Sequence, residues 1–383
     1  MGLEDRAALS TLQAAVDEDL VRDCYDTWFT HDRSVRDLFP PDLVGQRGAF
    51  SQALGWVLGE FAAQRSAEPV AFLAQLGRDH RKYGVQPRHY DSLRGALYSA
   101  LRARLGTGWT AAVSDAAYAA VTLITGVMSG AADADGGPPW WEATVFEHLR
   151  VSRDLAVVRL ELDGPLPYHP GQYVSVEVPQ CPHRWRFLSP ARPADPQHLV
   201  EFHVRAVPGG LVSPAIVAET RPGDRWRLSG PHGALHVDRD GDDVLMVAGS
   251  TGLAPLRALI MDLTRFDDNP RVHLFFGARY PGELYDLQTL WDLAGRHRWL
   301  SVSPVSEYGA DPPWARDYPD PTPPRGLHVR QTGRLPEVVS GYGGRGDRQI
   351  LISGRAAMVA ATRAALIARG TPPQRIQHDP LGG

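Results

Sequence analysis

Hydrophobic residues in the first third of the chain recur at helical spacing. Between residues 10 and 132 they return every three or four positions, as in the segments 54–61 and 72–76, which is the spacing of one helix face. Proline is rare in this stretch and falls at Pro40, Pro41, Pro69 and Pro87. Because proline suits a first helical turn and breaks a helix interior, these positions open or separate helices. The pattern predicts an all-α domain over residues 1–134.

The pattern changes at the polar, Gly- and Pro-rich segment 133–139, and we expect a linker over residues 135–141. Short runs typical of strands follow at 142–148, 156–162, 173–178, 200–205 and 225–228, with Gly/Pro turns between them. Closely spaced short strands with such turns favour a small antiparallel β-barrel. We expect this barrel over residues 142–240.

From residue 243 onward, apolar runs alternate with helical stretches. The runs lie at 244–248, 272–276 and 349–353, and we expect a helix from Pro255 to about Leu263 and another after the last run. Alternating strands and helices predict a parallel sheet covered on both faces, here over residues 241–383. The proline-rich segment 311–325 is interpreted as a loop inserted in this α/β domain. The predicted fold is thus multidomain: all-α, antiparallel barrel, then parallel-sheet α/β.

Composition excludes several classes of function. The net charge is -4 and the basic residues are dispersed, so no cluster of positive charge indicates a nucleic-acid partner. Cys24 and Cys181 belong to no metal-binding spacing, which argues against iron–sulfur clusters and structural zinc. The N-terminal residues lack the basic-then-apolar pattern of a signal peptide, and we expect no window of the roughly 18 uncharged apolar residues that a membrane span needs. We therefore expect a soluble, cytoplasmic protein with no membrane span.

The helical part contains a candidate haem site. A haem needs one axial imidazole and a mostly apolar cavity, and His80 lies late in a helical run. A lone histidine is more often a surface or core residue, but His80 is accompanied by three other residues that suit a haem pocket. Tyr25 lies within a predicted helix, Phe39 stands at a helix end before Pro40, and Gln46 begins the next helix, about one helix length before His80.

In order and spacing, these residues resemble the globin domain of flavohaemoglobins. The resemblance implies that His80 is the metal ligand of haem b, that Phe39 wedges the haem, and that Tyr25 and Gln46 face bound oxygen. A tyrosine hydroxyl donates a strong hydrogen bond to such a ligand in a dry pocket.

Three further positions bear on the haem pocket. Phe50, one turn after Gln46, either restricts the distal volume or packs in the core. The resemblance implies that Tyr90 polarises His80. The family's glutamate partner is expected within residues 127–130, where this chain has Ser129; a carboxylate there makes the axial imidazole more electron-donating.

The barrel part carries candidate flavin-binding residues. The segment Arg186-Phe-Leu-Ser189 lies after a predicted strand and resembles the Arg-x-Tyr-Ser signature of ferredoxin-reductase-like flavoproteins, with Leu188 in place of the tyrosine. By that resemblance Arg186 meets the FAD pyrophosphate and Ser189 the flavin ring, in reach of Tyr173. Backbone amides and hydroxyls for phosphate follow in the family's order, at Gly209, Gly210, Val212, Ser213, Gly230 and Gly233. Both glycine pairs also suit plain turns.

The α/β part carries candidate residues for a nicotinamide nucleotide. A strand leads into the loop Gly249-Ser250-Thr251-Gly252-Leu-Ala-Pro255, which opens a helix, the context in which such a loop binds a pyrophosphate. The loop is similar to the Gly-Gly-Thr-Gly-Leu-Ala-Pro form of the same reductases, with Ser250 replacing a glycine.

Other positions of this reductase pattern follow at later strand ends and at the C-terminus. Arg279 follows one strand, where it favours NADPH if it binds a 2′-phosphate, although NADH is preferred here. Gly354 follows another strand, in Ser353-Gly-Arg where the family has Cys-Gly-Pro. Near the C-terminus Asp379 keeps the family's acid over the flavin, and Leu381 replaces its aromatic residue.

The whole chain thus resembles flavohaemoglobin: a globin domain, an FAD-binding barrel and an NAD(P)-binding domain. The resemblance implies a nitric oxide dioxygenase in which electrons from NADH or NADPH pass through FAD to haem, with O2 and NO as substrates, acting as a monomer or weak dimer. One alternative is a divergent flavohaemoprotein that takes electrons from another donor, such as a hydroxy acid. A second alternative is a haem-based gas or redox sensor.

Overall fold

The computed structural model describes residues 3–64, 67–313, 328–342 and 347–379. The chain divides into two compact units, a first unit up to Trp140 that also includes Pro182–Arg184, and a second unit from Trp141 onward. The division of the second unit into a barrel part and an α/β part follows from its two separate sheets. The three parts confirm the predicted fold class in the predicted order.

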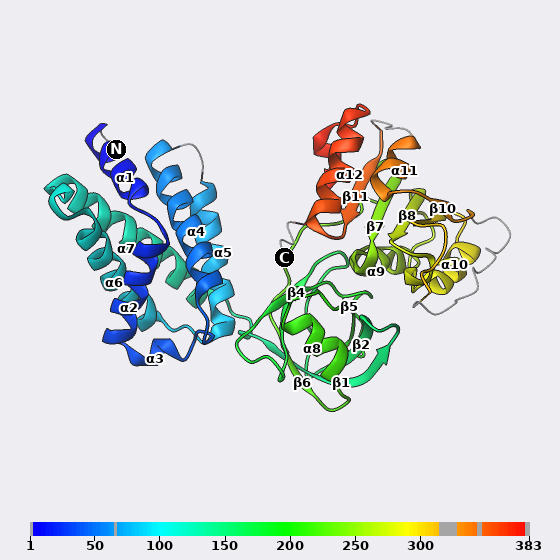
Figure 1. Cartoon of the computed structure of the whole chain (residues 1–383), viewed down its shortest axis with the longest axis horizontal. Coiled ribbons are helices and arrows are strands. Elements are labelled where there is room, and N and C mark those ends of the chain that lie inside the picture. The colour runs from blue at the N-terminus through cyan, green and yellow to red at the C-terminus, as the bar shows by residue number, and fades with distance from the viewer. Residues whose placement is uncertain (1–2, 65–66, 314–327, 343–346, 380–383) are drawn as a thin grey trace. The chain divides into compact units, whose positions relative to one another are not determined.

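The first unit is helical (Figure 1). Its described elements are α1 (Leu3–Ala14), α2 (Glu18–His31), α3 (Arg33–Arg36), α4 (Val44–Ala63), α5 (Glu68–His80), η1 (Arg81–Tyr83), α6 (Pro87–Leu105), η2 (Gly106–Gly108) and α7 (Ala111–Ala134). Local sequence explains several helix boundaries. Asp17 caps α2 by accepting a hydrogen bond from the Leu20 amide at 2.8 Å. Proline stands in the first turn of both α5 and α6, where its missing N–H costs no hydrogen bond.

Helix α7 corrects the expectation that no stretch of the chain is apolar enough for a membrane span. By length and composition alone it is apolar enough to cross a membrane, with a mean hydropathy of 1.5. Val113, Val121, Ile124 and Met128 on α7 are nevertheless buried in the hydrophobic core of the first unit. The helix therefore has the packing of a core helix, which passes the same test of length and composition.

The second unit begins with an antiparallel barrel. Its elements are β1 (Trp141–Arg150), β2 (Leu155–Leu162), β3 (Val174–Glu177), β4 (Arg186–Leu188), β5 (Leu199–Arg205), α8 (Val212–Glu219) and β6 (Arg225–Leu228). The strand order is β4-β3-β6-β1-β2-β5, and a bridge between Pro190 and Phe202 brings the two edges together, so the barrel is nearly closed. Phe202 and Trp226 fill its core. The segment Arg186–Leu188, expected to follow a strand, is itself a strand, paired with β3.

The rest of the second unit is an α/β layer structure. Its elements are β7 (Val244–Gly249), η3 (Ser250–Gly252), α9 (Leu253–Leu263), β8 (Val272–Ala278), η4 (Pro281–Glu283), α10 (Leu287–Arg296), β9 (Leu300–Ser306), β10 (Gln331–Thr332), α11 (Leu335–Gly341), β11 (Gln349–Ser353), α12 (Ala356–Ala368), η5 (Pro373–Arg375) and β12 (Ile376–Gln377). The strands are all parallel, in the order β10-β9-β8-β7-β11-β12.

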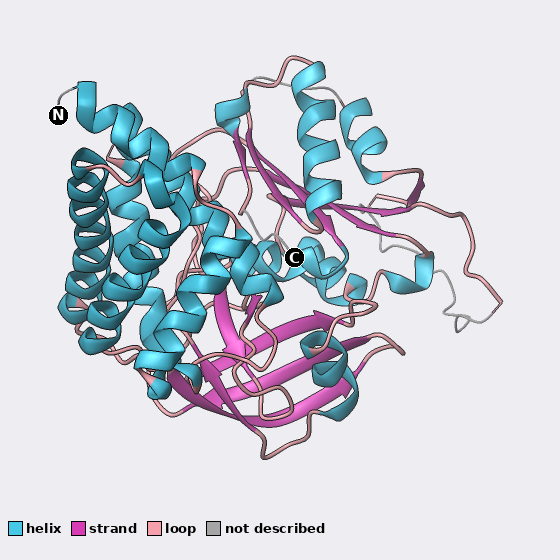
Figure 2. Cartoon of the chain, turned by 60° about the vertical axis from the view of Figure 1, so that its left-hand side comes forward, coloured by secondary structure: helices cyan, strands magenta, loops and turns pink. Residues whose placement is uncertain are grey.

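Helices cover both faces of this parallel sheet, as Figure 2 shows. Alternate sheet residues point to opposite faces: Met246 packs with α9 and α10, and Val247 packs with α11 and α12. The carboxyl ends of β7, β8 and β11 consequently meet at one edge, where ligands bind in such sheets. Helix α9 begins at Leu253, two residues before the predicted start. Most of the predicted proline-rich loop, and Leu381, lie outside the described residues.

Candidate functional site

The first unit contains a cavity of about 370 Å³. Side chains from α2, α4, α5, α6 and α7 line it, and so does Phe39 from the segment between α3 and α4. The other predicted residues in the lining are Tyr25, Gln46, Phe50, His80 and Tyr90. Most of the remaining lining is apolar, including Leu54, Val57, Leu73, Leu76, Leu93, Leu97, Ile124 and Met128. Two histidines line the cavity, His80 and His89, and the His89 ring contacts the Gln86 amide at 3.1 Å and Arg88 at 3.3 Å. A mostly apolar cavity with an available histidine is what a haem requires, so the residues present fit this group.

Tyr25 is held in the cavity by other aromatic rings. Its ring centroid lies 5.3 Å from that of Phe39 in an edge-on arrangement and 5.8 Å from that of Phe50. Burial raises the pKa of Tyr25, so its hydroxyl keeps its proton and acts as a donor. Within the described part of the chain this hydroxyl makes no hydrogen bond. The Tyr25 hydroxyl therefore has its donor available for a ligand in the cavity.

Gln46 provides a second polar side chain on the cavity wall. It lies in the first turn of α4 and is half-buried. Its side-chain amide has no hydrogen-bond partner among the described residues. The amide and the Tyr25 hydroxyl are the kind of isolated polar groups that orient a small ligand in an otherwise apolar pocket.

His80, the last residue of α5, is the candidate iron ligand. Burial, with a smaller contribution from Lys82, lowers the pKa of His80 to about 4. The imidazole is therefore neutral at neutral pH, which is the form that binds metals. The imidazole makes no hydrogen bond to any described residue.

Tyr90 lines the same cavity, but its hydroxyl lies 3.5 Å from the carbonyl oxygen of Gly77 rather than against His80. The helices α5 and α7 meet here at close range, because a Cβ added to Gly77 would lie 2.1 Å from the Met128 carbonyl oxygen. Burial, and after it the charge of Asp133, raises the pKa of Tyr90. The role of Tyr90 in polarising His80 stays a prediction.

The predicted flavin-binding residues surround a small group of rings. Tyr173 lies 5.0 Å from Phe187 and 5.7 Å from His232, measured between ring centroids. Phe187 on β4 is 48% exposed, so a large apolar surface faces outward at this point of the barrel. Asp379 accepts a hydrogen bond from the Ala234 amide at 3.3 Å, and burial raises the pKa of Asp379.

The other predicted flavin-binding residues lie on two elements. Arg186 and Leu188 belong to β4, and Ser189 follows it. Gly210 precedes α8, while Val212 and Ser213 form its first turn; the Ser213 hydroxyl accepts a hydrogen bond from the Val207 amide at 3.0 Å. An exposed arginine, an exposed aromatic ring and the Ser213 hydroxyl at a helix start fit a flavin nucleotide.

The predicted nucleotide site is a cavity of about 970 Å³ in the second unit. Both parts of that unit line it, with Gly249, Ser250 and Arg279 among the predicted residues. Gly252, within the loop, lies close to the end of β11, because a Cβ added to it would be 2.3 Å from the Ser353 carbonyl oxygen. Thr251, Gly252, Pro255 and Gly354 shape the loop and its surroundings without lining the cavity. A glycine-rich loop at the start of α9 fits a pyrophosphate.

The residues by which the barrel contacts the nucleotide loops are not among those predicted from the sequence. Strand β5 reads Glu201-Phe-His203-Val-Arg205, and its polar residues alternate with core residues. Alternate residues share one face of a strand, so this alternation was the signal that could have revealed the polar face. Arg205 Nε donates to the Ser250 hydroxyl at 2.8 Å, and the guanidinium also pairs with Asp154 and Glu283.

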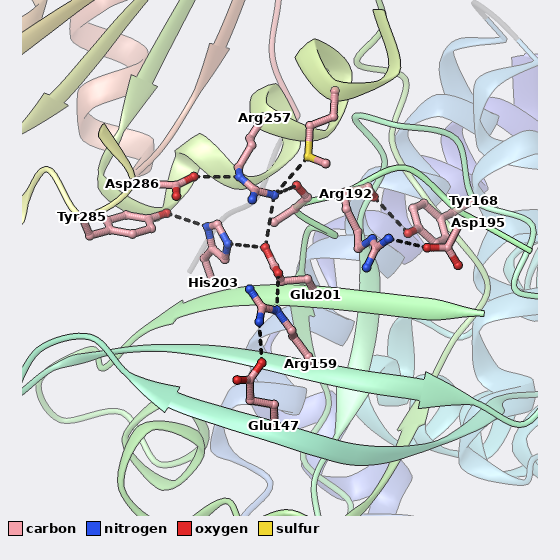
Figure 3. A network of polar contacts seen from close by, with 12 residues as sticks. Glu147, Arg159, Tyr168, Arg192, Asp195, Glu201, His203, Arg257, Tyr285 and Asp286 are labelled. Atoms are coloured by element: carbon pink, nitrogen blue, oxygen red, sulfur yellow. Dashed lines mark hydrogen bonds and ion pairs between the residues drawn. The ribbon is translucent and has the colours of Figure 1, made fainter. Parts of the chain in front are cut away.

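Glu201 and His203 extend this face into a buried polar network (Figure 3). His203 lies between Glu201 and the Tyr285 hydroxyl, each 2.9 Å from one ring nitrogen. Arg257 on α9 pairs with both Glu201, at 3.1 Å, and Asp286, at 2.7 Å. Burial alone would raise the pKa of Glu201, but the His203 hydrogen bond and the Arg257 charge hold it well below its usual value.

Three family models match this chain. Residues 22–128 match the globin family, residues 142–237 the oxidoreductase FAD-binding domain, and residues 246–364 the oxidoreductase NAD-binding domain. The predicted cofactors, a haem, FAD and a nicotinamide nucleotide, are confirmed by these three domain types. The domain boundaries at residues 134, 142 and 240 stay our proposal.

Curated relatives match part of the chain. The reductase component DmpP of phenol 2-monooxygenase, from Pseudomonas sp. (strain CF600), is 33% identical over 192 residues, which are 48% of this chain and 54% of that protein. The reductase subunit of an aromatic O-demethylase, from Amycolatopsis sp., is 32% identical over 242 residues, 62% of this chain and 68% of that protein. The chain thus spans between about half and two thirds of the length of these two relatives.

Solved structures extend the comparison. The Amycolatopsis cytochrome P450 reductase GcoB is 30% identical, with a TM-score of 0.55 over 64% of this chain and 70% of its own. The flavohemoglobin of Malassezia yamatoensis, solved with bound FAD and heme, shares the fold of nearly the whole chain: its TM-score is 0.76 at 15% identity, over 99% of this chain and 98% of its own.

An oxidoreductase built from an FAD-binding and an NAD-binding domain, with a globin in front, is the class that this fold and these sites define. The chain combines a globin domain with an FAD- and NAD-binding reductase module, and it shares the fold of a flavohemoglobin over nearly its whole length. This architecture supports the transfer of electrons from NAD(P)H through FAD to haem.

Proposed function

We propose that this protein is a nitric oxide dioxygenase, which uses O2 and electrons from NADH or NADPH to oxidise NO to nitrate. The observation that carries the proposal is the composition of the first-unit cavity. Tyr25 and Gln46 present polar groups without partners among the described residues, and the same cavity holds the neutral imidazole of His80. Such a pocket suits a small ligand that becomes negatively charged, because a buried donor is worth more there than in water.

Haem would supply oxygen binding at its iron, and FAD the exchange of electrons between a two-electron donor and a one-electron acceptor. The chain's own residues hold and shield these groups. His80 would bind the iron, Tyr25 would donate a hydrogen bond to the ligand, and the apolar lining would exclude water. Arg186 and Ser189 would hold FAD, with Ser213 at the start of α8.

In the second unit, the loop between β7 and α9 would bind the nucleotide pyrophosphate. Ser250 and Arg279 line that cavity together with Met358. Several relatives are named as ferredoxin–NAD(P)+ reductases, which supports a nicotinamide donor over a hydroxy acid. A cytoplasmic location and a monomeric or weakly dimeric state remain predictions from sequence.

Consumption of NO tests the proposal. Protein loaded with haem and FAD is mixed with NO in aerated buffer, with NADH or NADPH, and nitrate is measured. We expect nitrate in proportion to the NO consumed and to the nucleotide oxidised. Turnover supported by lactate but by neither nucleotide would favour the other electron donor. Ligand binding without turnover would favour the sensor.

A further inference from the structure

Ser250 stands in a backbone conformation that serine rarely adopts. Its φ is +54°, in the left-handed region, where a side chain crowds the following carbonyl and glycine is the usual residue. Gly249 before it is extended, and Gly252 after it leads into α9. The left-handed turn at Ser250 is thus the point at which the chain changes from strand to helix at the predicted pyrophosphate loop.

Arg205 fixes this residue from the barrel. Its Nε donates a hydrogen bond of 2.8 Å to the Ser250 hydroxyl, and its Nη1 lies 2.6 Å from Asp154 and 3.3 Å from Glu283. Asp154 belongs to the turn between β1 and β2, whereas Glu283 lies in the loop after β8 and accepts hydrogen bonds from the Arg279 and Tyr280 amides. One side chain therefore ties the barrel to two nucleotide loops.

The surroundings of Arg205 indicate that it holds the loop in position and does not attract the negatively charged nucleotide. Its side chain is only 11% exposed and faces two carboxylates, whose negative charges balance its single positive charge. A guanidinium held in this way presents one N–H in a fixed direction, which a flexible ammonium does not do. That N–H is the one bonded to Ser250.

We propose that Arg205 is a positioning residue for the nicotinamide nucleotide: by its hydrogen bond to Ser250 it holds the loop after β7 in the left-handed turn that the pyrophosphate requires. The role arises because this chain has serine where its relatives' pattern has glycine. Without the hydrogen bond, Ser250 relaxes toward a common conformation and the loop amides turn away from the cavity. The inference rests on the proposed nucleotide function of this cavity.

Two substitutions at Ser250 separate the effect of its hydroxyl from the effect of its backbone conformation. Ser250→Ala and Ser250→Gly both remove the hydrogen bond, but only alanine keeps a Cβ that opposes the left-handed conformation. The assay is NADH-dependent reduction of ferricyanide by the FAD-loaded full chain, with NADPH in a parallel series. Ferricyanide takes electrons directly from the reduced protein, so the assay needs no reaction with O2 or NO. We expect Ser250→Ala to raise KM for the nucleotide about tenfold with little change in kcat, and Ser250→Gly to raise it no more than about threefold.

Arg205→Met supplies the second arm. With serine at position 250 we expect KM to rise about tenfold, and in the Ser250→Gly background by no more than about threefold, because glycine needs no support. The matched control is Arg225→Met, which removes an exposed barrel arginine paired with Asp163 and leaves KM unchanged.

Three outcomes overturn the inference in distinguishable ways. Equal increases in KM for Ser250→Ala and Ser250→Gly would show that the left-handed turn needs no support from the Ser250 hydroxyl. This comparison does not depend on whether Arg205→Met folds. An equal effect of Arg205→Met in both backgrounds would make Arg205 a direct ligand of the nucleotide. A wild-type protein reduced by neither nucleotide would overturn both the inference and the proposed function.

Discussion

Replacing Tyr25 with phenylalanine removes one hydroxyl from the first-unit cavity and leaves its packing in place. The ring is 5% exposed and packs against Phe39 and Phe50, and these contacts do not involve the hydroxyl. Because that hydroxyl bonds to no described residue, its loss breaks no hydrogen bond of the ligand-free protein. We therefore expect the substitution to affect the bound ligand and to leave folding unchanged.

The size of the effect follows from the strength of the lost interaction. A hydrogen bond to a group that carries charge contributes about 1.5–3 kcal/mol, and each 1.4 kcal/mol is a factor of about ten in affinity. Tyr25→Phe should therefore accelerate oxygen dissociation from the reduced globin by about 10- to 100-fold. Dissociation is measured by stopped flow, with displacement of oxygen by carbon monoxide.

A second tyrosine provides the control. Tyr98 on α6 has its hydroxyl 2.8 Å from the Ser114 hydroxyl and does not line the cavity. Tyr98→Phe should leave oxygen dissociation within about twofold of the wild type, because it removes a hydrogen bond outside the cavity. If Tyr25→Phe also dissociates oxygen at the wild-type rate, the hydroxyl does not contact the ligand and the predicted role of Tyr25 is wrong.

Three further predictions concern packing and charge. Gly77→Ala should destabilise the first unit by about 1–3 kcal/mol in urea unfolding, because the new Cβ would lie 2.1 Å from a backbone carbonyl oxygen of α7. The control Gly95→Ala on α6, whose Cβ would have no atom within 4 Å, should not destabilise it. Equal effects of the two substitutions would exclude the clash. Glu201→Gln should cost about 3 kcal/mol at pH 7. Because the pKa of Glu201 is lowered by folding, the wild-type advantage is full above about pH 4.3 and shrinks as the pH falls below it; an advantage constant from pH 7 to 3 would contradict this. Burial raises the pKa of the Cys24 thiol to about 12, so iodoacetamide at pH 8 should label Cys181 and spare Cys24 until the protein is unfolded; labelling of both in the folded protein would refute it.

The large divisions of the fold could be predicted because each part has its own hydrophobic period. Helical spacing, short alternating strands and buried runs followed by helices are distinct patterns. The elements that the sequence did not predict are short or lack a regular hydrophobic periodicity. Strand β4 has three residues, and its pairing with β3 is a tertiary contact. Helix α8 begins Val212-Ser-Pro and is apolar on most of its surface, so no amphipathic pattern marks it.

The candidate sites divide in the same way. Tyr25, Gln46 and His80 could be proposed together because their spacing follows a family pattern, and the structure places them around one cavity. Arg205 could not, since its partner Ser250 lies 45 positions further along the chain and on a different sheet system. The replacement of a glycine by Ser250 was visible in sequence, but its left-handed backbone and its support by the barrel appear only in three dimensions.

The central claim is that one chain takes electrons from a nicotinamide nucleotide and delivers them to a haem. The most direct test is the visible spectrum of the purified, cofactor-loaded protein under argon, before and after addition of NADH, with NADPH in parallel. We predict loss of the oxidised flavin absorbance together with a shift of the Soret band to that of ferrous haem. Flavin and haem that both stay oxidised with either nucleotide would contradict the claim.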